Sequence, residues 1–515
     1  MAPVEIPAML TRNRPLLLTG VMAAVLMQTL DTTIANVALP HMSAALGATS
    51  DTITWVLTSY VLASAVVLPL AGWLVDRVGI RRLMIGSVLL FTAASMLCGA
   101  AQSLNQMVFF RILQGVAGAF LAPLSQTIIL DTSTAAERPK MMSIYTQGIM
   151  LGPISGPIIG GYLTDNFNWR WVFYVNLPVG IGCVALLLLF LPDTPRRERR
   201  IDLLGWALVA IAVSGLQLVL DRGADLDWFA SPEIVIEAIV AASCLWMAVV
   251  HLATGKAPLF PTAMLADRNF IIGLVFTGIM GLVMMSVMAL LPGLLQQIYG
   301  YSALQSGTML APRGVGMLIS ITVFGRWMNR VDPRILLAIG LMLMSLSLWM
   351  MAHWSVDMPQ FPIIASGVLQ GVGLSFSFMP VNLISFATLA PHFRTDAASL
   401  SNLLKNVGSS VGIAAASVLL SRNLQINHAE IGAHVTQALL PFASDMNSAF
   451  APVTGMALGV VDAMVNQQAA MIAYLDDFLL MSFACLGAIP LLLLAKPVKR
   501  SAGVNAAAAA AEAAH

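Results

Sequence analysis

The chain consists largely of long apolar runs separated by short polar segments. Charged residues make up only 10% of its 515 residues and hydrophobic residues 58%, whereas a soluble protein carries roughly 25% charged and about 45–50% apolar residues. A surface that faces water cannot be covered with so few charges. The runs have the length of about 18 to 25 residues that a helix needs to cross a bilayer core, where backbone groups must bond internally. We therefore predict an all-α integral membrane protein.

Fourteen such runs predict fourteen transmembrane helices. Their extents are 15–39, 53–74, 83–101, 104–129, 141–163, 172–191, 203–220, 233–253, 270–292, 306–328, 335–352, 361–389, 397–420 and 472–495. With an even number of spans both ends of the chain lie on one side. The connecting segments on that side carry 20 Lys and Arg and the opposite ones carry 3, which predicts that both termini are cytoplasmic.

The two parts of the chain resemble each other at an offset of about 255 residues. Leu113-Gln114-Gly115-Val116 recurs as Leu369-Gln370-Gly371-Val372. The repeat predicts two parallel six-helix halves with two inserted helices, an arrangement that favours alternating-access transport. The predicted divisions are a cytoplasmic tail 1–14, a six-helix bundle 15–191, inserted helices and loops 192–268, a second bundle 269–499 with a long external loop 421–471, and a disordered tail 500–515.

Charged residues inside spans are costly unless paired, so each is a functional candidate. Asp31 and Arg111 both fall in the outer half of the membrane, on spans 1 and 4. A pair that protonation can break suits a proton-coupled carrier; the alternative is a static bridge between two helices.

Two further cations, Arg313 and Lys405, lie inside spans of the second half. They either face an anionic or polar substrate or bind backbone carbonyls. Together with Gln28, Asn36 and Gln114 they are predicted to line a substrate cavity.

Glycine occurs at every fourth residue along one face of span 5, within Gly148, Gly152-Pro153, Gly156-Pro157 and Gly160-Gly161. Small residues allow close helix contact and proline loosens a helix. This pattern predicts a close, bendable contact between the two halves, with a dimerisation face as the alternative.

The loop after span 2 combines a turn, a carboxylate and cations: Gly72, Asp76, Arg77, Gly79, Arg81 and Arg82. We interpret it as a breakable cytoplasmic latch; the alternative is a positively charged loop with no further role.

Several other classes of function are disfavoured. A net charge of +1 gives no field that would attract nucleic acid, and the one Gly-Lys pair, Gly255-Lys256, is not followed by the Ser or Thr of a phosphate-binding loop. The seven histidines are scattered and the four cysteines lie in apolar runs, so no metal site, cofactor or catalytic site is predicted. We expect a transporter and not an enzyme.

From residue 15 to 497 the sequence resembles the major facilitator superfamily, and within it the fourteen-span drug/proton antiporters of the EmrB/QacA family. The motifs that carry this resemblance are the Leu30 to Pro40 segment, the Gly72 to Arg82 loop, Arg111 with Gln114-Gly115, the Gly148 to Gly161 segment, and Trp169-Arg170-Trp171 leading to Asn176 and Pro178. The resemblance implies the major facilitator fold and export driven by proton entry. It places proton coupling at Asp31 and Arg111, gating at Asp76 and Arg77, and an antiporter motif on the glycines of span 5.

The resemblance also implies partners and a location. It implies lipophilic drug-like compounds and protons as cargo, the inner membrane of a Gram-negative cell, a periplasmic adaptor like EmrA and an outer-membrane channel like TolC, which the segment 421–471 would face. Some family members that export dications carry an acid in span 12, whereas residues 361–389 contain none. With Arg313 and Lys405 present, we hypothesise a preference for neutral or weakly acidic lipophiles. A proton-coupled transporter of a single metabolite is the alternative.

Overall fold

The computed structural model describes residues 9–134, 137–193, 196, 199–224, 226–255, 258–327, 331–434 and 454–496. Every element of regular secondary structure in these ranges is a helix. The elements before the inserted pair are α1 (Met9–Leu46), α2 (Ser50–Ile53), α3 (Trp55–Val67), η1 (Leu68–Leu70), α4 (Ala71–Val78), α5 (Ile80–Ala100), α6 (Leu104–Gly118), α7 (Leu121–Asp131), α8 (Arg138–Asn166), α9 (Trp171–Tyr174) and α10 (Asn176–Phe190). We refer to them as the first half.

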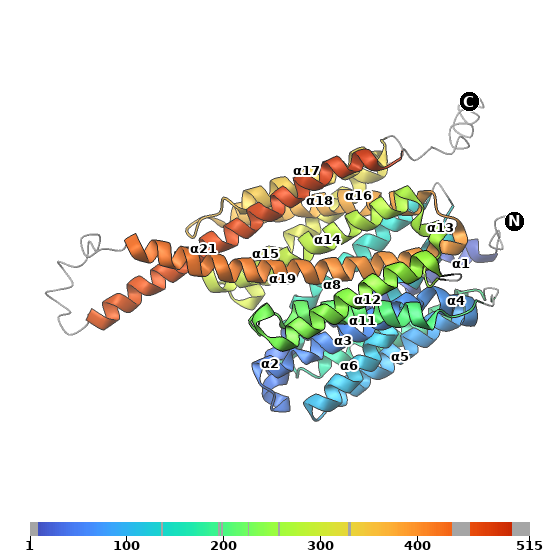
Figure 1. Cartoon of the computed structure of the whole chain (residues 1–515), viewed down its shortest axis with the longest axis horizontal. Helices are drawn as coiled ribbons and strands as arrows, with labels where there is room; N and C mark the ends of the chain where they lie inside the picture. Colours follow the sequence, from blue (N-terminus) through green and yellow to red (C-terminus); the bar gives the residue numbers. More distant parts are fainter. Residues whose placement is uncertain are drawn as a thin grey trace.

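The inserted pair and the second half follow. The inserted elements are α11 (Leu203–Arg222), η2 (Trp228–Ala230), α12 (Pro232–Thr254) and α13 (Thr262–Leu265). The second half comprises α14 (Arg268–Gly293), η3 (Leu294–Ile298), α15 (Ala303–Leu310), α16 (Pro312–Trp327), α17 (Pro333–Met351), α18 (Gln360–Ala387), η4 (Pro391–Phe393), α19 (Arg394–His434), α21 (Thr454–Ala488) and η6 (Ile489–Leu494). Figure 1 shows the long helices running side by side, with α1 beginning and α21 ending toward the same end of the bundle.

Twelve helices in the described ranges are long and apolar enough to cross a membrane, as the predicted fold class requires. The two predicted spans that do not meet this criterion are 141–163 and 306–328, although both lie on helices, α8 and α15–α16. Glycine, proline and polar residues lower the mean hydropathy of α8. The second span is divided at Ala311, just before Pro312, and leaves helices of only 8 and 16 residues. The total of fourteen therefore stays a prediction.

The predicted external loop 421–471 is helical in its described part. Helix α19 continues past the expected end of its span to His434, and α21 already begins at Thr454. The two helices pair beyond the bundle through an ion pair of 3.3 Å between the exposed side chains of His428 and Asp462, and Figure 1 shows them projecting together past the other helices. An amphipathic stretch of this kind is expected to form a structured, partly helical loop, and residues 421–434 and 454–471 are helical because each span continues into a helix that packs against its neighbour.

The two halves repeat the same packing, as the sequence repeat predicted. Helix α1 packs against α8, and α14 packs against α19 in the same way. Glycines provide the close approach in both pairs: a Cβ on Gly152 would lie 2.3 Å from Thr29 Oγ1, and one on Gly408 would lie 2.3 Å from the carbonyl oxygen of Gly278. The pairs Gly115 with Tyr60 and Gly371 with Arg313 repeat this contact between α6 and α3 and between α18 and α16.

The halves are joined by apolar packing at the end of the bundle that holds α4, which we call the latch end. One buried hydrophobic cluster there contains Leu68 and Ala71 of the first half together with Ala397 and Ala398 of the second. Another cluster of the first half, around Ile34 and the α2 end of α1, is drawn from the first half alone. Apolar burial therefore holds the two halves together at the latch end.

The inserted helices α11 and α12 pack on each other, and α11 also contacts both halves. Trp206 Nε1 donates a hydrogen bond of 2.8 Å to the Val66 carbonyl oxygen of the first half. Ser410 Oγ of the second half donates to Gln217 Oε1 at 2.8 Å. The pair thus lies along the seam between the halves.

Candidate functional site

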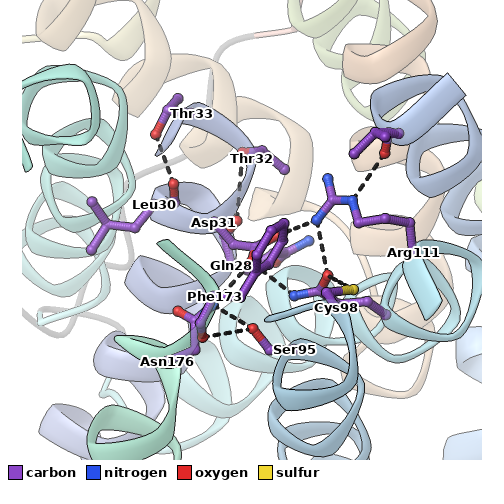
Figure 2. Close-up of polar contacts among 12 residues, drawn as sticks. Gln28, Leu30, Asp31, Thr32, Thr33, Ser95, Cys98, Arg111, Phe173 and Asn176 are labelled. Carbon is purple, nitrogen blue, oxygen red and sulfur yellow. Dashed lines mark hydrogen bonds and ion pairs between the residues drawn. The ribbon is translucent and has the colours of Figure 1, made fainter. Parts of the chain in front are cut away.

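Asp31 and Arg111 form an ion pair inside the first half, as Figure 2 shows. Arg111 Nη1 lies 2.7 Å from Asp31 Oδ2, and neither side chain is accessible to solvent. Burying an ion pair stabilises a structure only when further hydrogen bonds satisfy both groups. The hydrogen bonds around the pair therefore determine whether it is stable in its charged form.

Two amides complete the shell of the carboxylate. Gln114 Nε2 donates to Asp31 Oδ1 at 2.8 Å, and its own Oε1 accepts from Arg111 Nη1 at 2.9 Å. Asn176 Nδ2 donates to Asp31 Oδ1 and to Ser95 Oγ, both at 2.9 Å. Both carboxylate oxygens accept hydrogen bonds, which is the pattern of an ionised carboxylate. Helices α1, α5, α6 and α10 all contribute to this network.

The guanidinium is held from a further helix. Arg111 Nε donates to the carbonyl oxygen of Val56 at 2.9 Å, and Arg111 Cζ lies 4.4 Å from the centre of the Tyr60 ring. Both contacts come from α3. Arg111 Nη2 is buried without a hydrogen-bond partner, so this cation depends on Asp31 for its neutralisation.

This arrangement links protonation to helix packing. A proton on Asp31 removes the counter-ion of a buried guanidinium, and an unpaired buried charge is strongly destabilising. The helices that hold the pair must then rearrange or admit water. The geometry can therefore convert the binding of one proton into a change of structure.

One of the residues predicted to line the substrate cavity belongs to this hydrogen-bond network. Gln114 was expected in a substrate cavity, but it is fully buried and bonded to Asp31 and Arg111. Gln28, one turn before Asp31, is half-buried and its Oε1 has no hydrogen-bond partner. Asn36 lies further along α1 with an exposed side chain.

A small cavity of about 50 Å³ lies between the halves. Lys405 is the cation of its lining, and no carboxylate belongs to that lining; a role in binding substrate stays a prediction. Gln126 of α7 and Asn382 of α18 meet there through a hydrogen bond of 2.8 Å. The cavity is lined by Gln126, Tyr145, Thr146, Ile149, Thr277, Phe378, Asn382, Ser401, Asn402 and Lys405.

Arg313 does not belong to the lining of that cavity. It is buried on α16, where its carbonyl oxygen would lie 2.0 Å from a Cβ on Gly371 of α18. Its Nε and Nη2 atoms have no hydrogen-bond partner. The two predicted cations therefore lie in different surroundings.

The glycine motif of span 5 makes a close contact, but within the first half and not between the halves. A Cβ on Gly148 would lie 2.2 Å from Met22 Cε, and one on Gly156 would lie 2.1 Å from Thr33 Oγ1. Gly160 approaches Ile34 of the same helix, α1, whereas Gly161 has no atom within 4 Å. The predicted contact between halves was wrong because the small face of α8 packs against α1.

Helix α8 meets the second half through a different face, where Ile158 lies near Gly307 of α15. The backbone of α8 continues as one helix through positions 153 and 157; the side chains of Pro153 and Pro157 lie outside the described part of the chain.

The loop predicted as a latch takes part in a contact between the halves. Arg199 Nη1 lies 2.8 Å from Asp396 Oδ2 of α19 and 3.6 Å from Asp76 Oδ2 of α4. A Cβ on Gly72 would lie only 1.7 Å from Asp396 Oδ1, so glycine is required for this approach. We call Asp76, Arg199 and Asp396 the clamp. Nearby, Arg394 pairs with Asp131, and Ser399 Oγ donates to the carbonyl oxygen of Leu68.

The remaining latch residues have other roles. Arg77 is exposed and lies outside the clamp. Gly79 ends α4 with φ +93°, a backbone conformation that favours glycine. Arg81 Nη2 donates to the carbonyl oxygen of Leu188 at 2.7 Å and ties α5 to α10.

Sequence reasoning missed three residues of these sites: Asn176, Arg199 and Asp396. Asn176 stood in a quoted motif, and its polarity inside an apolar run was the available signal. Arg199 was one of several arginines in the segment before the inserted helices, and the sequence does not distinguish it from Arg200. In the described part of the chain no group of three or more His, Cys, Asp or Glu residues could hold a metal ion.

Comparisons with known proteins agree with this architecture. The family model of the Major Facilitator Superfamily matches residues 21–413. The chain is 34% identical to the multidrug export protein EmrB of Escherichia coli K12, over 87% of this chain and 86% of that protein. It is 33% identical to the fatty acid resistance protein FarB of Neisseria gonorrhoeae, over 93% of this chain and 96% of that protein.

Among solved structures, the fold resembles the human organic anion transporter MFSD10 with a TM-score of 0.58 at 14% identity, covering 95% of this chain and all of that one. The chain therefore belongs to the Major Facilitator Superfamily, as a multi-pass membrane protein related to the EmrB multidrug export proteins.

Proposed function

We propose that this protein is a proton-coupled multidrug efflux antiporter that exports lipophilic compounds by alternating access across the inner membrane, with both termini in the cytoplasm. The names of its relatives support export of drug-like compounds. The observation that carries proton coupling is the buried Asp31–Arg111 pair, because protonation of its carboxylate removes the counter-ion of Arg111.

The contacts between the halves support alternating access. The latch end, which this proposal places on the cytoplasmic side, is closed by the clamp and by a shared apolar cluster. A carrier closed at this end can exchange cargo only with the opposite side. Cargo entry from the cytoplasm then requires that the clamp opens.

The charge of the central cavity supports neutral and weakly acidic lipophiles as cargo. Its lining contains Lys405 and no carboxylate, so it offers no counter-ion for a dication and one for a carboxylate. The name of the relative FarB, a fatty acid resistance protein, agrees with this preference.

The projecting ends of α19 and α21 support a partner outside the membrane. They extend about 21 Å (α19) and about 27 Å (α21) past the predicted spans at 1.5 Å per residue and point away from the latch end (Figure 1). We propose that they face a periplasmic adaptor like EmrA, which would connect the protein to an outer-membrane channel like TolC.

The experiment that tests proton coupling uses purified protein in liposomes with an imposed pH gradient and a fluorescent pH probe inside. Unrelated lipophilic compounds should dissipate the gradient with the wild type and not with Asp31→Asn. The exposed carboxylate Asp462 provides a matched control, because Asp462→Asn removes a charge far from the pair and should leave exchange intact.

Two results would overturn the proposal. Equal exchange by the wild type and Asp31→Asn would show that Asp31 does not couple protons. Exchange with a single metabolite and with no other compound would favour the narrow transporter that remains the second candidate.

A further inference from the structure

One acidic side chain of the second half is buried in apolar surroundings and has no part in the sites described above. Asp477 lies on α21 with 2% of its surface exposed, and its Oδ2 atom is buried without a hydrogen-bond partner. It shares a face of the helix with the core residues Tyr474, Phe478 and Met481, at the spacing of three and four residues typical of a buried face. Asp476 is exposed, so the two adjacent acids have different surroundings.

In the described part of the chain no cation neutralises Asp477. The groups whose charge interacts with it are Asp476 and Tyr474, and neither is positive. The cations on the helices that α21 packs against lie elsewhere: Arg268 at the start of α14, Arg334 bonded to the Ala495 carbonyl oxygen, Lys405 in the central cavity, Arg394 paired with Asp131, His428 paired with Asp462, and the exposed Arg422 and His434. Asp477 is therefore a buried carboxyl group without a counter-ion among these residues.

Such surroundings favour the protonated form of the carboxyl group. An isolated carboxylate is so costly in an apolar environment that the group binds a proton instead. Asp31 differs, because its two carboxylate oxygens accept hydrogen bonds from Arg111 and Gln114. One conformation thus holds one acid in a site for the ionised form and another in a site for the neutral form, and opposite environments of this kind mark groups that transfer protons.

Asp477 lies in the outer half of the membrane, as Asp31 does. It is five residues inside the external end of its predicted span, 472–495, which is about 8 Å at 1.5 Å per residue. The whole bilayer core is about 30 Å thick. A proton that reaches Asp477 from the external side therefore has a short path.

The face of α21 that holds this acid packs against an irregular part of α14. Pro292 lies near the end of that helix, which continues as the π-helix η3, and π-helical turns are frequent at functional sites. A Cβ on Gly293 would lie 2.9 Å from Tyr474 Oη. Gln467 Nε2 of α21 donates to the Ile298 carbonyl oxygen of η3 at 3.0 Å. Loss of the proton would place a charge beside this contact, which must then open to water.

We propose that Asp477 is a second proton-binding site of the carrier. It takes a proton from external water while the latch end is closed, and returns it to water on the cytoplasmic side after the halves and α21 have rearranged. Each transport cycle then moves two protons, one at Asp31 and one at Asp477. The transport role rests on the proposed function, whereas binding of the proton does not depend on it.

Infrared spectroscopy of the full chain in lipid nanodiscs tests proton binding without any gradient. A protonated carboxyl group has a carbonyl stretch that a carboxylate lacks. At neutral pH the wild type should show this band, Asp477→Asn should lose it, and Asp476→Asn should retain it. No loss in Asp477→Asn, or the same loss in both variants, would overturn the proposal. A band that appears only when choline replaces Na⁺ would mean that the site binds Na⁺ instead.

The accumulation of a neutral drug in liposomes tests coupling. At zero membrane potential, a proton gradient of about tenfold supports accumulation of about 100-fold with two protons per cycle and of about tenfold with one. Asp477→Asn should therefore lower the accumulation about tenfold, whereas Asp476→Asn should leave it unchanged. Asp477→Glu keeps a titratable group and should restore most of it. Loss of all exchange in both Asp477→Asn and Asp477→Glu would show that the shape of the residue matters and not its proton.

The outcomes separate this inference from the proposed function. If the wild type exchanges protons with drugs and Asp477→Asn keeps its accumulation ratio, the second site is wrong and the antiporter stands. If the wild type exchanges no protons but Asp477→Asn alone removes the carbonyl band, the proton site holds and the proposed antiport is wrong.

Discussion

The Asp31 carboxylate is held by side chains of α6 and α10, and Arg111 is held in turn by the backbone of α3. This places one ionisable group where four helices meet. The position that matches Arg111 in the second half is Gly367, which packs near Arg313 of α16. The symmetry of the halves is therefore broken at the position of the buried guanidinium.

For this ion pair we predict that removing the carboxylate alone lowers the free energy of unfolding more than removing both charged side chains. Asp31→Ala leaves Arg111 charged and unpaired, so the free energy of unfolding should fall by about 3–5 kcal/mol. The double variant with Arg111→Leu has no unpaired charge and should be less destabilised than Asp31→Ala alone. Thermal unfolding of the purified variants in detergent measures both effects. Additive losses would show that the two residues do not depend on each other.

The contact between α1 and α8 depends on glycine, which leads to a prediction at the scale of the element. A Cβ on Gly156 would lie 2.1 Å from Thr33 Oγ1, so Gly156→Ala should force the helices apart and cost about 1–3 kcal/mol of stability. Gly161→Ala is the matched control, because nothing lies within 4 Å of its Cβ. Thermal unfolding compares the two variants, and equal stability would mean that the small face is not needed.

The inserted helices are tied together by Asp202, which precedes α11. Its carboxylate accepts from the backbone N–H groups of Gly205 and Leu259, at 2.9 and 3.0 Å, and pairs with His251 of α12 at 2.9 Å. Burial raises the pKa of Asp202, but these hydrogen bonds and the His251 charge outweigh it and hold the pKa below its usual value. A carboxylate with a lowered pKa in the folded state stabilises the protein at all pH values above its unfolded pKa of about 3.9.

We therefore predict that Asp202→Asn lowers thermal stability at pH 7, and that its difference from the wild type shrinks as the pH falls through the lowered pKa, below about 4. Unfolding temperatures measured between pH 3 and 7 test this. A difference that stays constant over this range would mean that the charge of Asp202 does not contribute.

At the scale of the whole molecule, the clamp ties the two halves together at the latch end. In the described part of the chain, Arg199 lies between the carboxylates of Asp76 and Asp396 and pairs with both. It is also held by its backbone, because Trp73 Nε1 donates to its carbonyl oxygen at 3.0 Å. The segment that leads into the inserted helices thus fastens the two halves together.

We predict that Arg199→Gln shifts the molecule toward a conformation with an open latch end, since two like charges would then face each other. Spin labels on Arg77→Cys and His392→Cys, both exposed, report the distance across this end, and the four native cysteines are buried. The variant should populate longer distances than the wild type. Arg200→Gln, an exposed neighbour, should leave the distance distribution unchanged, and the same shift in both variants would contradict a specific clamp.

The sequence by itself determined that the helices lie in a membrane, that the chain contains two related halves, and that Asp31 and Arg111 are partners. Apolar runs with few charges dictate membrane helices because lipid offers the backbone no hydrogen bonds. Motifs that recur at an offset of about 255 residues revealed two related halves. These halves have matching helix contacts in the structure. Asp31 and Arg111 were recognisable because a charge inside an apolar run is costly without a partner.

Only the tertiary structure decided which side chains meet across long separations in the chain. The sequence could not assign Gln114 to the ion pair, single out Arg199 among its neighbouring arginines, or direct the glycine face of α8 toward α1. It also could not reveal the small cavity between the halves, whose lining comes from segments up to about 280 residues apart. Local sequence determines the pattern of apolar, polar and glycine residues along each helix. Which helix faces contact each other depends on how all the helices pack together.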